Sequence, residues 1–243
     1  MTAPPDSNHS ALRLQSFGAN YRALVIGSSG ALGQAFCAQL RSDTGCAQVT
    51  ELSRHTLPAL DLTDPPSIAA AAQALADQGP YQLILLATGI LHAPCIAPEK
   101  SLAAIEADAL QRVFQINSLG PALVLRHFLP LLDASGAMAV LSAKVGSIED
   151  NRLGGWYAYR ASKAALNMLL KTAAIEHARQ RPKARLLSLH PGTVVSKLSE
   201  PFRGAANARP AAQAAAELLR VIDQSSAQDS GGFFSYQGER LPW

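Results

Sequence analysis

Apolar runs of five or six residues recur along the chain from Tyr21 onward, and longer stretches with helical spacing separate them. Short apolar runs that alternate with amphipathic helices are typical of βαβ units, which build a parallel sheet covered on both faces. We therefore expect an α/β fold with a three-layer, doubly wound parallel sheet. The expected strands are Arg22–Ile26, Gln48–Leu52, Gln82–Ala87, Ala137–Ser142, Arg185–His190 and Gly232–Tyr236, and the expected helices are Ala31–Arg41, Pro65–Gln78, about Asp108–Leu132, Tyr157–Gln180 and Pro210–Asp223.

The length and composition of the chain suit one domain. Its 243 residues are 48% hydrophobic and 16% charged, which provides enough apolar side chains for one large core. We expect that single domain to span residues 21–243, after a loosely ordered extension over residues 1–20, which is polar and contains prolines. The extension lacks the apolar stretch of a secretory signal, and no apolar run reaches the roughly 18 residues of a membrane span.

Charge and cysteine usage exclude several classes of function. The formal net charge is +3, and Lys and Arg are scattered rather than gathered into a run that could follow a phosphate backbone. Cys37, Cys46 and Cys95 have neither CxxC spacing nor an even count, so neither a zinc site nor a disulfide framework is expected. We expect a cytoplasmic protein that binds no metal, nucleic acid or membrane.

The turn after the first expected strand carries three spaced glycines. It reads Gly27-Ser28-Ser29-Gly30-Ala31-Leu32-Gly33 and leads directly into a helix. Glycine allows unusual dihedral angles and close backbone approach, while the free N–H groups and positive dipole of a helix N-terminus favour a pyrophosphate. The absence of a Gly-Lys-Ser/Thr ending argues against a triphosphate-binding loop. The turn therefore predicts a dinucleotide-binding Rossmann fold, rather than a merely structural turn.

The second expected strand ends in Glu51-Leu52-Ser53-Arg54, where a dinucleotide-binding fold contacts the adenosine ribose. A small residue followed by arginine leaves room and positive charge for a 2′-phosphate, so Ser53 and Arg54 favour NADP(H), with NAD(H) possible. Glu51 fits this interpretation if strand alternation turns it away. Otherwise Arg54 is an ordinary surface residue. Asp61 either contacts the adenine edge or caps the next helix.

Tyr159 and Lys163 stand four residues apart on the expected helix 157–180, and so they share one face. A phenol with a pKa of about 10 exchanges protons poorly at neutral pH unless a nearby cation stabilises the phenolate. Lys163 supplies such a cation, and a lowered pKa suits general acid–base catalysis at a carbonyl or alcohol. The spacing alone is typical of any surface helix, but the glycine turn upstream favours catalysis.

With these residues in this order, the chain resembles the short-chain dehydrogenase/reductase family over about residues 21–243, in particular its branch of C-factor-like proteins and carbonyl reductases. The resemblance rests on Gly27–Gly33, Asp61, Asn117, the segment Tyr157–Lys163 and the turn Pro191-Gly192-Thr193-Val194. It implies that Tyr159 exchanges the substrate proton and that Lys163 also holds the nicotinamide ribose. Asn117 would help to place Lys163 through a water. The alternative for Asn117 is a plain core amide.

The resemblance also implies the contacts with the cofactor. The backbone of Pro191, Gly192 and Val194 would pass against the nicotinamide, and Ser196 would meet its carboxamide. The family's usual Asn-Asn-Ala-Gly is replaced by Leu86-Ala87-Thr88-Gly89, which loses side-chain bracing but keeps a glycine for close approach. The expected cofactor-binding residues are Gly27, Ser29, Gly30, Ala31, Leu32, Gly33, Ser53, Arg54, Asp61, Leu62, Ala87, Thr88, Gly89, Tyr159, Lys163, Pro191, Gly192, Val194 and Ser196.

The third catalytic group departs from the family pattern. Members carry a serine three residues before a glycine at the end of the fifth strand, and alignment to Gly146 puts Ala143 there. Ser142 lies one residue earlier, and adjacent side chains of a strand face opposite ways. Either a bulge brings Ser142 round, or Ser147 or a backbone group replaces it, or the hydrogen bond is missing. We take Ser142 as the candidate, beside Tyr159, Lys163 and Asn117.

Two functions fit these residues. The first is an oxidoreductase that transfers a hydride between NADP(H) and a small carbonyl or alcohol substrate, with Tyr159 as general acid/base assisted by Lys163. The second is a nucleotide-binding regulatory or signalling protein with weak or no catalysis, which Ala143 permits. His92 and Trp156 either contact the substrate or pack as ordinary loop and core side chains. The C-terminal strand is expected at a sheet edge, and the resemblance then implies a homodimer or homotetramer.

Overall fold

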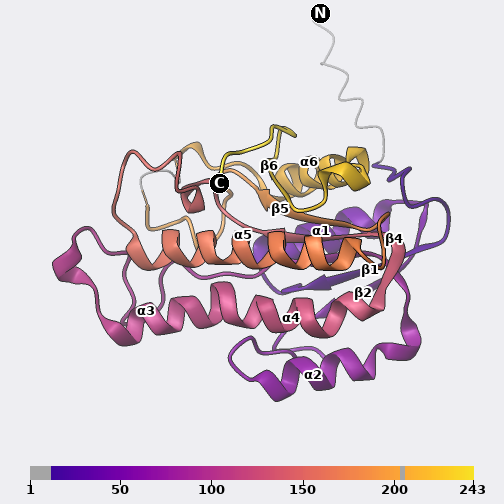
Figure 1. The fold of residues 1–243 in the computed structure, drawn as a ribbon, viewed down its shortest axis with the longest axis horizontal. Coiled ribbons are helices and arrows are strands. Elements are labelled where there is room, and N and C mark those ends of the chain that lie inside the picture. Colours follow the sequence, from indigo (N-terminus) through magenta and orange to yellow (C-terminus); the bar gives the residue numbers. More distant parts are fainter. Residues whose placement is uncertain (1–11, 203–205) are drawn as a thin grey trace, which may run out of the picture.

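The computed structural model describes residues 12–202 and 206–243, which form a six-stranded sheet between two layers of helices (Figure 1). Neighbouring strands are all parallel, in the order β2-β1-β3-β4-β5-β6. The strands are β1 Tyr21–Ile26, β2 Cys46–Leu52, β3 Tyr81–Leu86, β4 Leu132–Leu141, β5 Arg185–His190 and β6 Gly232–Ser235. The expected doubly wound, three-layer fold is confirmed.

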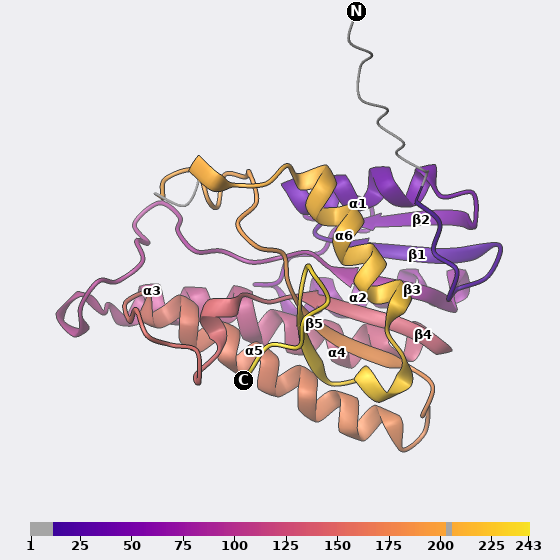
Figure 2. The same ribbon diagram turned by 90° about the horizontal axis from the view of Figure 1, so that it is seen from above.

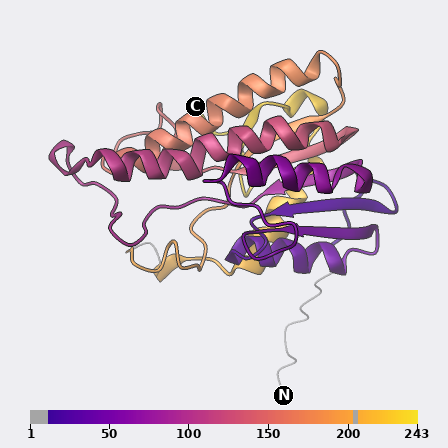
Figure 3. The ribbon, with the colours of Figure 1, turned by 90° about the horizontal axis from the view of Figure 1, so that it is seen from below.

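The helices cover both faces of this sheet. They are α1 Ala31–Ser42, α2 Pro65–Ala74, α3 Ala107–Phe114, α4 Gly120–Phe128, α5 Tyr157–Ala178 and α6 Ala211–Gln224. Figures 2 and 3 show the two helical layers from opposite sides, with α1 and α6 in one and α2, α4 and α5 in the other. Leu24 and Ile26 of β1 enter one core, while Ala23 and Val25 enter the other. Burial on both faces explains why β1 and β3 end in continuous apolar runs.

The expected long helix over about Asp108–Leu132 is interrupted in the middle. Gln115–Leu119 form a π-helical segment between α3 and α4, and a 3-10 turn over Leu129–Leu131 ends the run. Strand β4 then begins at Leu132, earlier than the expected Ala137. Polar residues at the start of β4 hid that part of the strand from the hydrophobic pattern.

The expectation of a loosely ordered extension is wrong for residues 12–20. Leu14 is 1% exposed and lies in the core beneath α1 and α6. Its N–H donates to the buried carboxylate of Asp43 at 2.8 Å, and the Tyr21 hydroxyl donates to the same oxygen at 2.8 Å. A few buried leucines and backbone hydrogen bonds suffice to fix a short segment, which a polar composition conceals. Residues 1–11 of the expected extension lie outside the described residues.

Strand β6 lies at the edge of the sheet, as expected, but its outer side is covered. The Ser235 N–H donates to the Glu239 carbonyl at 2.8 Å, and the Leu241 N–H donates to the Phe233 carbonyl at 2.8 Å. Few backbone groups of β6 are therefore left for a strand of a second subunit. Over the described ranges, no helix is both long and apolar enough to span a membrane.

Candidate active site

A cavity of about 230 Å³ lies where β1, β2 and β3 end. Strand β1 lies between β2 and β3 in the sheet. The chain runs from β1 to β2 on one side and then crosses to β3 on the other side, so the strand order reverses at this point. Such a switch point at the carboxyl ends of strands is where open α/β sheets bind ligands. The cavity is lined by Gly27, Ser29, Gly30, Ser53, Arg54, Leu60, Asp61, Leu62, Thr63, Ala87, Thr88, Gly89, Ile90, Arg112 and Ile116. Predicted cofactor-binding residues from all three strand ends thus share one cavity.

The glycine turn forms one wall of the cavity and requires glycine at two positions. Gly27 has a φ of +89°, and a Cβ there would lie 2.7 Å from the Ala87 carbonyl oxygen. A Cβ on Gly33 would lie 2.1 Å from the Gly27 carbonyl oxygen, so no larger residue fits. Ala31, Leu32 and Gly33 form the first turn of α1, whose N-cap Gly30 provides no side-chain cap. The N–H groups of this turn lack intrahelical partners and suit an anion.

At the end of β2, the structure resolves the orientation of Glu51. Glu51 forms an ion pair with Arg41 of α1, which directs its carboxylate to that helix. Ser53 and Arg54 instead line the cavity. The Glu51 carboxylate, which would repel a 2′-phosphate, therefore points toward α1, while the Arg54 guanidinium lines the cavity.

Asp61 also faces the cavity and does not cap the next helix, whose N-cap is Asp64. Its Oδ1 accepts hydrogen bonds from the Thr63 N–H and the Thr63 hydroxyl, both at 2.8 Å. Burial opposes ionisation, but these bonds and the charges of Arg54 and Arg112 outweigh it and hold the pKa of Asp61 below its usual value. Asp61 is thus a fixed, ionised acceptor. Arg112 and Thr63 were missed because helix periodicity does not reveal which polar residues border a cavity.

Tyr159 and Lys163 both point inward from α5, where they are 9% and 3% exposed. The Lys163 Nζ donates to the Leu141 carbonyl at 2.8 Å and lies 5.9 Å from the centre of the Tyr159 ring. Burial lowers the pKa of Lys163 to about 8 and raises the pKa of Tyr159 to about 12. The expectation of a lowered Tyr159 pKa is therefore wrong for this structure, because burial of the phenol disfavours the phenolate.

Asn117 lies within the π-helical segment and is fully buried. Its Oδ1 accepts from the Ile90 N–H at 2.8 Å, and its Nδ2 donates to the Ile90 carbonyl at 2.9 Å and to the Ser162 hydroxyl at 3.1 Å. π-Helical segments are frequent at functional sites. A Cβ on Gly89 would lie 3.3 Å from Asn117 Oδ1 and 3.2 Å from Lys163 Nζ. The amide therefore joins the loop after β3 to α5, next to Lys163.

On its other side, Tyr159 meets an apolar cluster drawn from four parts of the chain. The Trp156 ring lies 6.3 Å from the Tyr159 ring and 5.3 Å from the Phe202 ring. The His92 ring lies 5.6 Å from the Phe202 ring, and its Nε2 is 2.9 Å from the Lys197 carbonyl oxygen. This packed apolar cluster consists of Leu91, Ala143, Val145, Trp156, Tyr159, Leu198 and Phe202, and we call it the Tyr159 pocket because we expect the substrate to contact it. Trp156 and His92 thus belong to this pocket and its rim.

The structure brings Ala143, as the sequence alignment indicated, against Tyr159. Ala143 is 8% exposed and packs in the Tyr159 pocket. Within the described part of the chain, the buried Ser142 hydroxyl has no hydrogen-bond partner, and the Ser147 hydroxyl donates to the Trp243 carbonyl at 3.1 Å. A catalytic role of Ser142 stays a prediction, whereas Ser147 is occupied elsewhere.

The residues after β5 form a separate part of the site. Gly192 has a φ of +71°, and Val194 is buried and pairs with Arg209 in a β-bridge. The Ser196 hydroxyl donates to the Val194 carbonyl at 3.2 Å. Ser196 borders a second cavity of about 360 Å³, together with Val195, Lys197, Ser199, Glu200 and Ala208. Pro191, Gly192, Val194 and Ser196 therefore lie outside the cavity at the ends of β1, β2 and β3.

Comparison with known proteins shows the class to which this site belongs. A family model described as enoyl-(acyl carrier protein) reductase matches residues 27–235. The chain is 31% identical over 186 residues to 1-hydroxy-2-glutathionyl-2-methyl-3-butene dehydrogenase of Rhodococcus sp. (strain AD45), a match that covers 76% of this chain and 79% of that protein. It is 34% identical over 168 residues to C-signal of Myxococcus xanthus, covering 68% and 94%. The chain therefore belongs to the short-chain dehydrogenase/reductase family, as the motifs predicted.

Solved structures agree in fold. The NADPH-bound carbonyl reductase from chicken fatty liver superposes with a TM-score of 0.80 at 22% identity, covering 93% of this chain and 95% of that one. The carbonyl reductase Sniffer of D. melanogaster gives a TM-score of 0.78 at 23% identity, covering 93% and 100%. Together with the family match, these findings make the chain an oxidoreductase of the short-chain dehydrogenase/reductase family.

Proposed function

We propose that this oxidoreductase transfers a hydride between NADP(H) and a small apolar carbonyl or alcohol compound, with Tyr159 as general acid/base. The observation that carries the proposal is the meeting of Tyr159 and Lys163 with the loop after β3. A Cβ added to Gly89 of that loop would lie only 3.2 Å from Lys163 Nζ, so glycine at this position lets the lysine approach the loop backbone. The site thus joins a proton-exchanging pair to the cavity of the glycine turn. The NADPH named for the chicken carbonyl reductase, which shares this fold, supports the choice of cofactor.

The residues of the cavity fit a nicotinamide dinucleotide. Gly27 and Gly33 leave room that a Cβ would fill, and the first turn of α1 offers N–H groups to the pyrophosphate. Arg54 would hold the 2′-phosphate, and Asp61 would accept from the adenine edge. Pro191, Gly192, Val194 and Ser196 would border the nicotinamide. When bound, this cofactor supplies or accepts the hydride.

Tyr159 and its neighbours would exchange the proton. In the reductive direction the Tyr159 phenol donates its proton to the substrate oxygen, and the Lys163 ammonium stabilises the phenolate that remains. The Leu141 carbonyl holds Lys163 Nζ, and Asn117 fixes the loop at Ile90 beside it. The apolar side chains of the Tyr159 pocket would exclude water and favour an apolar group on the substrate.

Arg54→Ala should weaken NADPH binding by roughly 10- to 100-fold, because a charge-assisted hydrogen bond to phosphate contributes about 1.5–3 kcal/mol. NADH binding should change little, since NADH lacks the 2′-phosphate. Titration calorimetry with both cofactors would measure the two dissociation constants. Arg126→Ala is the control, because Arg126 is an exposed arginine of α4 that does not line the cavity. An equal loss of affinity for NADPH and NADH would show that Arg54 does not bind the 2′-phosphate.

Carbonyl reduction should slow as the pH rises through about 8. Lys163 carries its charge below its pKa of about 8 and loses it above, whereas Tyr159, with a pKa of about 12, stays protonated throughout. The loss of rate therefore reports the ammonium that supports the phenolate, not loss of the transferred proton. Turnover would be measured at saturating NADPH across this range. In Lys163→Arg, whose side chain stays charged, residual turnover should not fall near pH 8. The assignment would be contradicted if Lys163→Arg lost turnover over the same pH range as the unmodified chain.

We also propose that the protein forms a homodimer or homotetramer and works in the cytoplasm. Because β6 is covered on its outer side, the surface offered for association is α5, where Met168 is 67% and Ile175 55% exposed. The three cysteines are unpaired, which suits a reducing compartment. A regulatory role with weak catalysis is the second candidate function, because Ala143 presents no hydroxyl to Tyr159.

A further inference from the structure

Glu99 is a buried acidic residue, 5% exposed, in the loop between β3 and α3. Acidic side chains are rarely buried unless they are paired, and within residues 12–202 and 206–243 no basic side chain forms an ion pair with Glu99. Its partners are backbone groups at the start of α5. The Trp156 N–H donates to the backbone carbonyl of Glu99 at 2.5 Å, and the Ala158 N–H donates to the side-chain oxygen Oε2 of Glu99 at 3.2 Å. Figure 1 shows this loop beside the amino-terminal end of α5.

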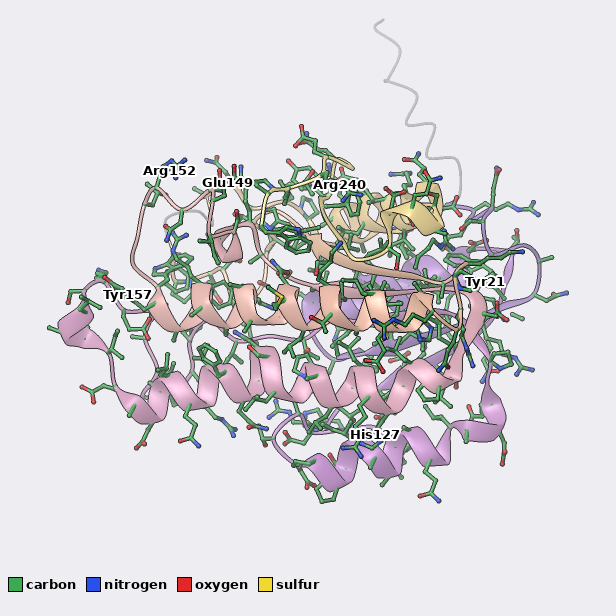
Figure 4. The ribbon with its side chains drawn as sticks, viewed as in Figure 1. Tyr21, His127, Glu149, Arg152, Tyr157 and Arg240 are labelled. Carbon is green, nitrogen blue, oxygen red and sulfur yellow. The ribbon has the colours of Figure 1, made fainter. Side chains whose placement is uncertain are left out.

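The chain enters α5 through a turn that needs external support. Gly154 and Gly155 both have a φ of +64°, and Trp156 follows with a φ of +53°. A bulky residue in the left-handed region is a backbone outlier that persists only where its surroundings enforce it. Trp156 is the N-cap of α5, yet its side chain makes no cap hydrogen bond. Figure 4 places Tyr157 directly after this turn, and Glu149 and Arg152 on the loop before it, at the end of the molecule opposite Tyr21.

Glu99 supplies the missing cap from a distant loop. Its carboxylate accepts from Ala158, the second residue of the helix, which is the N–H that an N-cap side chain normally binds. A negative charge at this position also interacts favourably with the helix dipole.

Arg160 holds the same turn from the other side. Its Nε donates to the Gly155 carbonyl at 2.9 Å, and its Nη1 donates to the Val145 carbonyl at 3.2 Å. The Gly155–Trp156 peptide is thus held at its oxygen by the Arg160 side chain and at its N–H by the backbone carbonyl of Glu99, and the Glu99 carboxylate adds the bond to the next turn at Ala158. This clamp fixes the Trp156 ring between Tyr159 and Phe202.

We propose that Glu99 is a positioning residue for the substrate side of the site: through the clamped turn, it holds Trp156 against Tyr159 and so shapes the Tyr159 pocket. The catalytic part of this inference rests on the proposed function. Glu99 does not line the cofactor cavity. Its removal should therefore impair substrate binding and spare the cofactor.

The first test follows Trp156 directly and needs no turnover. The chain has two tryptophans, so Trp243→Phe leaves Trp156 as the only one. In that background, Glu99→Ala should expose the indole and increase its quenching by acrylamide, while Glu99→Gln, which keeps an acceptor oxygen, should restore most of the protection. Glu106→Ala is the matched control, because Glu106 is an exposed glutamate nearby whose side chain caps nothing. Equal quenching in all variants would overturn the proposal.

The second test separates positioning from a general loss of structure. With a ketone substrate, Glu99→Ala should raise KM by roughly five- to tenfold, with a smaller change in kcat. A helix cap contributes about 1 kcal/mol, and the loss of that free energy from the conformation that binds substrate corresponds to a change of this size. The dissociation constant of NADPH should stay unchanged, and Glu99→Gln should recover KM. Parallel losses of NADPH binding and KM without rescue by Gln would overturn the proposal in favour of a merely structural role. If the unmodified chain shows no turnover, the proposed function fails, and the quenching experiment still decides the role of Glu99.

Discussion

Tyr159→Phe should reduce carbonyl turnover by about 10²–10⁴-fold, the usual contribution of a positioned general acid. Phenylalanine keeps the ring that packs against Trp156 and Ala143 but removes the hydroxyl that would donate the proton. Within the described residues the Tyr159 hydroxyl forms no hydrogen bond, and the Ser162 hydroxyl donates to the Tyr159 backbone carbonyl, which phenylalanine keeps, so the fold should tolerate the change. NADPH oxidation, followed by absorbance across a panel of aldehydes, ketones and quinones, would measure the loss.

Two accompanying measurements give this result its meaning. NADPH should bind Tyr159→Phe about as tightly as the unmodified chain, which shows that the cofactor site is intact. Tyr157→Phe is the matched control, because Tyr157 lies two positions earlier on α5 and is partly exposed (Figure 4). Unchanged turnover in Tyr159→Phe would remove Tyr159 from the chemistry. Binding without turnover in the unmodified chain, across the whole panel, would favour the regulatory alternative.

The parts of the site that sequence predicted are those fixed by local rules. The turn from Gly27 to Gly33 follows a buried strand and opens a helix, so its glycines and free N–H groups can be read along the chain. Tyr159 and Lys163 lie four residues apart on one helix and necessarily share a face. In both cases, neighbours in sequence remain neighbours in space.

The remaining features depend on contacts between distant segments. The Tyr159 pocket combines residues from the loop after β3, the end of β4, the start of α5 and the segment after β5. The bond between Glu99 and Ala158 joins residues 59 positions apart, and no periodicity marks such a pair. The pKa of Tyr159 was misjudged for the same reason. Its spacing from Lys163 was visible in the sequence, but the burial that raises the pKa was not.

Ala143→Ser should increase the rate of carbonyl reduction, by up to the order of 10²–10³-fold that a single oxyanion-side donor contributes. Ala143 packs against Tyr159 in the pocket, so a hydroxyl on its Cβ would enter the region where the substrate oxygen must meet the phenol. The buried Ser142 hydroxyl points to no partner among the described residues and provides no such donor in the present geometry. Steady-state kcat/KM with NADPH and one apolar ketone would measure the gain.

The same substitution decides which residue completes the catalytic group. If Ser142 already donates to the substrate oxygen, Ser142→Ala should lower the rate and Ala143→Ser should add little to it. If the donor is absent, Ser142→Ala should be nearly silent, and the gain from Ala143→Ser should persist in the double variant. Ala143→Val is the control for volume, since it adds bulk without a hydrogen bond. A gain with serine but not with valine would show that the hydrogen bond is the missing contribution, and that the protein retains the rest of a reductase site around Tyr159 and Lys163.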